Sequence, residues 1–148
     1  MIDRRAVLRG AEAAAVVGLT GCSSRLVDRP SLALSAENYR EEAVDLLLEV
    51  VRSDAADRSE ALVYRDRVRL APGAVGDEAW RADGVAPARP YRIEAEVRSG
   101  LEASHYHYVP DCTDGDSPYR PRVNLVLNEE PGVSFGQTTC SGEVASAP

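Results

Sequence analysis

Residues 36–53 carry apolar side chains at spacings of three and four positions along AENYREEAVDLLLEVVRS. This spacing predicts an amphipathic helix with one apolar stripe. Most acidic residues lie away from the stripe, and Asn38 with Glu41 has the capping-box pattern of a helix start. We expect this helix to pack on its own domain, with a partner-binding role as the alternative. The predicted stripe comprises Tyr39, Ala43, Leu46, Leu47, Val50 and Val51.

Residues 61–70 alternate between apolar and polar side chains, as a half-buried strand does. Their polar face carries three arginines, which could bind an anion or form a solvated face beside acidic neighbours. Residues 71–90 are rich in Pro and Gly but too long for an unstructured connection. We therefore expect a short turn of helix or a strand around Trp80. The three arginines are Arg65, Arg67 and Arg69.

Residues 91–98 and 101–109 also alternate, and Ser99-Gly100 between them is a two-residue hairpin signal. Closing the hairpin there fixes the register, because residues opposite one another share a face of the sheet. A slip of one residue would move the apolar side chains to the wrong face. The predicted apolar pairs are Ile93 with Tyr106 and Tyr91 with Tyr108.

The same register places His105 opposite Glu94 and His107 opposite Arg92. Imidazoles two positions apart on a strand point the same way, as a metal site requires. Glu94 is the candidate third ligand, and Asp111 follows nearby along the chain. If a divalent metal binds, we expect an open site of two His and one carboxylate. The alternative is an exposed strand face with a Glu–His contact.

Residues 122–128 and 133–140 alternate as two further strands. The acidic segment 111–118, which precedes them, favours a solvated loop over a weak cation site. The fold that follows is α+β, with one N-terminal amphipathic helix packed on an antiparallel sheet of about five strands. A small β-sandwich with an added helix is the alternative. Residues 141–148 are expected to form a frayed tail.

The charge balance excludes one class of partner. All 17 basic residues are Arg, against 24 acidic residues, and the formal net charge is −7. Phosphate binding needs clustered basic residues, so we expect no nucleic-acid partner. We find no nucleophile elbow, phosphate loop, dinucleotide fingerprint or Ser-His-Asp order, so catalytic machinery is not evident and the chain is not expected to be an enzyme.

The first 22 residues have the order of an export signal, with a basic start, a short apolar run and small residues. The apolar run, residues 11–19, is too short to span a bilayer. Arg4 and Arg5 within DRRAVLR resemble a twin-arginine motif, and Leu19-Thr20-Gly21-Cys22 resembles a lipobox. The alternative is a short amphipathic helix with a chance cysteine.

The resemblance to twin-arginine-exported prokaryotic lipoproteins implies cleavage before Cys22 and a lipid on its thiol. It divides the chain into a signal peptide (1–21), a lipid-anchored tether (22–35), a single globular domain (36–140) and the tail (141–148). A stable anchor implies a two-chain lipid. The protein would then lie at the extracytoplasmic face of the cell membrane, with the membrane as its one expected partner.

Without residues 1–21 the chain keeps 14 Arg and 22 acidic residues, a net charge of −8. An all-Arg, acid-rich composition is typical of GC-rich genomes, and we interpret the acid excess as haloarchaeal, with GC bias alone as the alternative. With Cys22 lipidated, Cys112 and Cys140 remain as an even pair in a compartment that permits a disulfide. Two free buried thiols are the alternative.

The function predicted from these features is that of a membrane-tethered domain with a binding or structural role at the cell envelope. The sequence does not specify the protein or small-molecule partner. A small metal-binding protein that uses the His-x-His strand face is the alternative.

Overall fold

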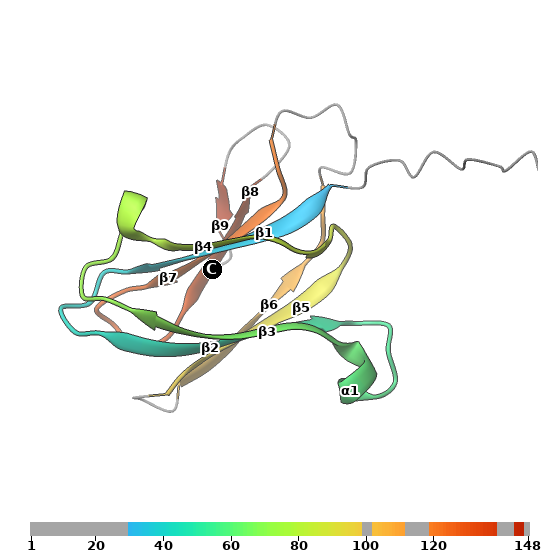
Figure 1. Ribbon diagram of the computed structural model, residues 1–148, viewed down its shortest axis with the longest axis horizontal. Helices are drawn as coiled ribbons and strands as arrows, with labels where there is room; N and C mark the ends of the chain where they lie inside the picture. The colour runs from blue at the N-terminus through green and yellow to red at the C-terminus, as the bar shows by residue number, and fades with distance from the viewer. Residues whose placement is uncertain (1–29, 99–101, 112–118, 139–143, 147–148) are drawn as a thin grey trace, which may run out of the picture.

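In the computed structural model the chain forms two β-sheets that pack face to face as a sandwich (Figure 1). Most neighbouring strands are antiparallel. The part of the chain that the structure describes holds only two short helical turns, α1 (Arg58–Ala61) and η1 (Gly76–Glu78). The described residues are 30–98, 102–111, 119–138 and 144–146.

The first sheet has five strands in the order β4-β1-β7-β8-β9. Its neighbours are antiparallel except for β1 and β7, which run parallel. The β1–β4 pairing shifts register between Leu32 and Leu34, opposite a stretch of β4 in which Gly84 has φ of 65°. Glycine adopts that left-handed backbone without the steric cost of a Cβ atom, so the irregularity is tolerated there. The strands are β1 (Ser31–Asn38), β4 (Trp80–Pro87), β7 (Arg122–Leu127), β8 (Ser134–Thr138) and β9 (Val144–Ser146).

The second sheet has four antiparallel strands in the order β3-β2-β5-β6. It forms the lower layer in Figure 1, with α1 at the end of the β2–β3 connection. Because β2 has a neighbour on each side, its backbone N–H and C=O groups are paired along both edges. The strands are β2 (Val44–Arg52), β3 (Leu62–Leu70), β5 (Tyr91–Val97) and β6 (Glu102–Tyr108).

The hydrophobic core lies between the two sheets, where alternate residues of each strand meet. On β2 the inward residues are Val44, Leu46, Leu48 and Val50, each at most 1% exposed. They belong to one cluster with Leu34 of β1 and Leu125 of β7 from the opposite sheet. The strand period of two therefore decides which side chains are buried.

The predicted helix over residues 36–53 is wrong, because these residues form the end of β1, a turn and β2. Three consecutive leucines fit a helical or a strand period equally well. In the structure Leu48 faces the core, while Leu47 lies on the opposite face of β2 and is 8% exposed. The fold is therefore a small β-rich fold and not one helix packed on a five-stranded sheet. The sandwich alternative agrees in its two sheets, and its added helix is absent among the described residues.

Asn38 is fully buried and closes the turn between β1 and β2, in place of its predicted role at a helix start. Its side-chain amide donates to the carbonyl oxygens of Glu42 and Ala71, each at 2.9 Å. Its Oδ1 accepts from the Arg40 backbone N–H at 3.1 Å. The buried Asn38 side chain thus pairs with backbone groups of this turn and of the segment that follows β3, so its own polar atoms are satisfied.

The predicted hairpin is confirmed in its register. β5 and β6 pair with Ile93 opposite Tyr106 and Tyr91 opposite Tyr108. The Ser99-Gly100 turn itself lies outside the described residues.

Other predicted segments are confirmed in outline. The strand expected over residues 61–70 is β3, and the connection over residues 71–90 contains η1 and β4, which begins at Trp80. The two strands expected over residues 122–128 and 133–140 are β7 and β8.

Both predicted ends of the globular domain differ from the strand boundaries. β1 begins at Ser31, inside the segment 22–35 predicted to be a tether. β9 (Val144–Ser146) pairs with β8, although residues 141–148 were expected to fray. None of the helices in the described ranges has the length and apolar character needed to cross a membrane.

Candidate functional site

Several sequence-predicted sites fall outside the described residues, so the structure leaves the export signal, the lipid attachment and the disulfide as predictions. These residues are Arg4, Arg5, Cys22, Cys112 and Cys140.

The two histidines share the outward face of β6, as predicted. His105 pairs with Glu94 and His107 pairs with Arg92, and both imidazoles are exposed. Their ring centroids lie 5.4 Å apart with an interplanar angle of 87°. The rings therefore contact edge to face.

Glu94, the predicted third ligand, is already engaged by arginine. Arg58 Nη1 and Nη2 donate to its two carboxylate oxygens at 3.3 and 2.7 Å, and Arg92 Nε lies 3.2 Å from Oε1. The hydrogen bond from Arg58 is the main cause that lowers the pKa of Glu94, against the opposing effect of partial burial. A general acid needs the opposite shift, so this carboxylate suits an ion pair better than proton transfer.

Within the described ranges, no three His, Cys, Asp or Glu side chains are grouped so that they could hold a metal ion. Asp111, considered as a further ligand, is exposed and follows the end of β6. The structure brings His105, His107 and Glu94 onto one face of the sheet. The Glu94 carboxylate, however, forms an ion pair with Arg58.

The predicted arginine row on β3 faces carboxylates of β2. Arg65 Nε lies 3.3 Å from Glu49 Oε1, and Arg69 Nη1 lies 3.0 Å from each carboxylate oxygen of Asp45. Arg58 also contacts Glu49. This face is a layer of exposed ion pairs, which matches the solvated alternative and not an anion site.

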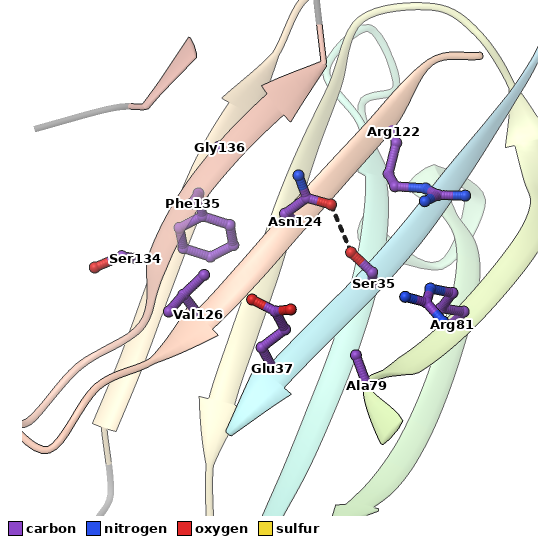
Figure 2. A pocket seen from close by; sticks show the side chains of 10 residues that line it. All are labelled: Ser35, Glu37, Ala79, Arg81, Arg122, Asn124, Val126, Ser134, Phe135 and Gly136. Carbon is purple, nitrogen blue, oxygen red and sulfur yellow. Dashed lines mark hydrogen bonds between the residues drawn. The ribbon is translucent and has the colours of Figure 1, made fainter. Parts of the chain in front are cut away.

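A groove of about 550 Å³ lies on the outer face of the five-stranded sheet, away from all the predicted sites. Figure 2 shows it with the lining side chains of β1, β4, β7 and β8. Its volume falls in the range that small-molecule sites occupy. The lining residues are Ser35, Glu37, Ala79, Arg81, Arg122, Asn124, Val126, Ser134, Phe135 and Gly136.

Strand pairing explains why this face is hollow. Ser35 on the central strand β1 pairs with Arg81 of β4 on one side and with Asn124 of β7 on the other. Asn124 in turn pairs with Gly136 of β8. One row across the sheet is thus arginine, serine, asparagine and glycine. The short side chain of Ser35 and the lack of a Cβ atom at Gly136 leave space between longer neighbours.

A single hydrogen bond sets the polarity of the groove floor. The buried Ser35 hydroxyl donates to Asn124 Oδ1 (Figure 2). A hydroxyl that has donated its hydrogen keeps acceptor lone pairs, and an amide that has accepted on oxygen keeps two N–H donors. The floor therefore offers an acceptor at Ser35 Oγ beside a donor at Asn124 Nδ2.

Arginines border the groove on the β4 side. In Figure 2 the side chains of Arg81 and Arg122 both extend to the side of Ser35 that is away from Asn124. Arg81 Nη2 donates to the Gly76 carbonyl at 2.7 Å, which fixes the side chain and leaves its charge uncompensated by that contact. Arg122 Nη2 lies 3.7 Å from a highly exposed Asp83, a weak ion pair.

One carboxylate lies along the same groove. Glu37 Oε1 accepts from the Gly76 N–H at 3.1 Å, so its position is held by the connection that carries η1. The lining side chains therefore carry two positive charges and one negative charge, in a chain whose net charge is −7. The groove is locally cationic within an acidic protein.

Sequence reasoning missed this groove because its floor joins residues far apart in the chain. Ser35 and Asn124 are 89 positions apart. Asn124 does stand out within the apolar strand RVNLVL as an outward polar residue. The sequence pattern does not connect Asn124 with Ser35, because the predicted tether over residues 22–35 places Ser35 outside the globular domain.

Comparison with known proteins gives no relative: no family model, no curated protein and no solved structure matches the chain significantly.

Proposed function

We propose that this chain is a lipid-anchored extracytoplasmic domain that binds a ligand at the cell envelope and does not catalyse a reaction. The observation that carries the binding role is the preorganised groove on the outer face of the five-stranded sheet. Its floor is held by the Ser35–Asn124 hydrogen bond, so little ordering remains to be done when a ligand arrives.

The position of β1 supports the tether. Ser31 follows Cys22 by nine positions, and an extended chain of that length spans at most about 30 Å. With a lipid on Cys22, the sandwich would be held close to the bilayer surface. The acidic domain would gain little from anionic headgroups, so the lipid would supply the attachment.

The charged side chains support a non-catalytic role. Glu49, Glu94 and Asp45 on the four-stranded sheet all contact arginine. A carboxylate engaged by a guanidinium group suits an ion pair better than the proton transfer that a general acid performs.

Membrane fractionation of cells that express the full chain tests this proposal. Wild-type protein is expected in the membrane fraction, and Cys22→Ser is expected to release it in soluble form. Replacing Arg4 and Arg5 together by Lys is expected to block export. Membrane attachment that survives Cys22→Ser would overturn the lipid anchor, and unchanged export of the double Lys variant would overturn the twin-arginine route.

A second proposal is a small metal-binding protein that uses His105 and His107. One observation favours it, namely that both rings are exposed on one strand face with centroids 5.4 Å apart. Metal analysis of the purified chain with and without His105→Ala tests it. Stoichiometric divalent metal that is lost on substitution supports this role, and no bound metal after saturation with zinc ends it.

A further inference from the structure

We infer that the groove over Ser35 and Asn124 is a binding site for a small polyhydroxylated carboxylate, the chemistry of a sugar acid. The inference rests on the proposed binding role and adds the class of ligand. It does not depend on the lipid anchor, so the two proposals can fail separately.

The carboxylate of such a ligand is assigned to the Arg81 and Arg122 side of the groove. Guanidinium groups bind carboxylates by charge-assisted hydrogen bonds, often with two parallel N–H donors. Arg81 pairs with Ser35 across β1 and β4, so its side chain starts one strand spacing from the groove floor. Arg122 comes from β7 and lies on the same side of the floor in Figure 2.

The hydroxyl groups are assigned to the floor and to Glu37. Ser35 Oγ accepts and Asn124 Nδ2 donates, because the direction of their mutual hydrogen bond leaves these two groups for a ligand. Each ligand hydroxyl can both donate and accept, which suits adjacent groups of opposite type. Glu37 adds a carboxylate acceptor on the same strand, two residues from Ser35.

The chemistry of the lining argues against two other ligand classes. The outward apolar side chains of the lining are Ala79 and Val126, whereas the Phe135 ring faces the core and stacks on Tyr106, so a lipid chain would find few apolar side chains to pack against. A dianionic phosphate would gain from the arginines but would meet Glu37, whose negative charge lies in the same groove. A monocarboxylate with hydroxyl groups matches both the charge and the polar floor.

Titration calorimetry of the full chain in detergent, at low ionic strength and pH 7, tests the inference. The probes are sodium D-galacturonate and D-galactose, which differ by one carboxylate. Galacturonate is expected to bind at least about tenfold more tightly, because only it can use the arginines. Equal affinity for the two sugars, or no binding of galacturonate, overturns the inference.

Three variants and one control locate the site. Arg81→Gln and Arg122→Gln are each expected to weaken galacturonate binding about tenfold, whereas Arg67→Gln on the outer face of the other sheet makes the same change and is expected to leave it unaltered. Asn124→Asp keeps the acceptor for the Ser35 hydroxyl but removes the donor and adds a negative charge, so it is expected to abolish galacturonate binding in a folded protein. Full binding by Asn124→Asp, or an equal loss in Arg67→Gln, would place the ligand elsewhere.

The same titration separates a free sugar acid from the end of a polymer. Digalacturonate that binds more tightly than the monomer would indicate a polymer, and equal affinities would indicate a free acid. Both results support the inferred chemistry. Loss of membrane attachment in the Cys22→Ser variant leaves this test unaffected, because the groove lies on the folded domain.

Discussion

The hydroxyl group of Tyr106 on β6 donates to Gln137 Oε1 on β8 at 2.8 Å and so joins the two sheets directly. Gln137 Nε2 then donates to the Val109 carbonyl at 3.0 Å, and the Gln137 side chain is largely buried. The Tyr106 ring stacks on Phe135 with centroids 5.6 Å apart. One tyrosine therefore links the sheets by an apolar contact and by a polar one.

Tyr106→Phe is expected to lower the free energy of unfolding by about 1–3 kcal/mol, because it leaves the buried Gln137 Oε1 without its donor while keeping the ring stack. Urea unfolding at pH 7 measures the change. The control is Tyr39→Phe, where the exposed hydroxyl makes only a 3.4 Å contact to Glu37 and the expected change is below about 0.5 kcal/mol. Equal losses in the two variants would show that the link between the sheets adds no stability.

The hairpin of β5 and β6 could be predicted because every cue was local. A two-residue turn signal and strict alternation over residues 91–98 determine which residues pair. The His105–Glu94 juxtaposition follows from the same count and is confirmed. What the local pattern could not supply was Arg58, which comes from α1 and takes up the Glu94 carboxylate.

The strand β2 could not be separated from a helix by pattern alone. Leu46, Leu47 and Leu48 are consecutive, and such a run satisfies either period. Residues 44–52 form a strand because they pair with β3 and β5, which accept and donate hydrogen bonds with the backbone N–H and C=O groups along both edges of β2. The pattern within β2 does not reveal these partner strands. The groove floor could not be predicted from the sequence for a similar reason. Ser35 and Asn124 lie side by side because β1 and β7 pair in parallel, and these strands are far apart along the chain.

Substitutions in β2 distinguish the strand from the helix that was first predicted. Leu48→Ala is expected to cost about 2–5 kcal/mol, because Leu48 is fully buried in the core between the sheets. Leu47→Ala, on the opposite face of the strand, is expected to cost at least about 1 kcal/mol less. The helical stripe included Leu47 and left out Leu48, so the helix predicts the reverse order. Thermal and urea unfolding of both variants decide between them.

Acid sensitivity is expected from Glu102. The Gly132 N–H donates to Glu102 Oε2 at 2.8 Å and Arg40 Nη2 donates to it at 3.0 Å. These two contacts, the first being the larger, lower the pKa of Glu102 below its ordinary value of 4.5. A carboxyl group whose pKa is lower in the folded state stabilises the fold above its unfolded pKa. That contribution is lost as the pH falls through the folded pKa.

The difference in unfolding free energy between wild type and Glu102→Gln is therefore expected to be full at pH 7. It should shrink as the pH falls below about 4.5 and disappear under stronger acid. Urea unfolding across this pH range measures it. Glu41→Gln is the control, because Glu41 is exposed at the same end of the molecule. A constant Glu102→Gln difference down to strong acid would contradict the ion pair.

The ion pair between Arg58 and Glu94 keeps the Glu94 carboxylate from the two histidines. Arg58→Gln removes the main cause that lowers the pKa of Glu94, so that pKa should rise toward its ordinary value while the carboxylate stays ionised at pH 7. Glu94 would then lose the contact of both its oxygens with Arg58 and keep the 3.2 Å contact with Arg92, which lets the carboxylate turn toward His105 opposite it on β6. Two imidazoles and a carboxylate on one strand face form a ligand set that suits zinc.

Arg58→Gln is accordingly expected to raise the zinc affinity of the chain about tenfold, because metal and guanidinium compete for the same oxygens and repel one another. Arg65→Gln provides the matched control, since Arg65 contacts Glu49 on the same face and removes an equal charge. Adding His105→Ala to Arg58→Gln should abolish the gain. An equal gain in zinc affinity for Arg65→Gln would show that the loss of one positive charge on this face, and not the release of Glu94, causes the effect. A gain that survives His105→Ala would place the metal away from the histidine face.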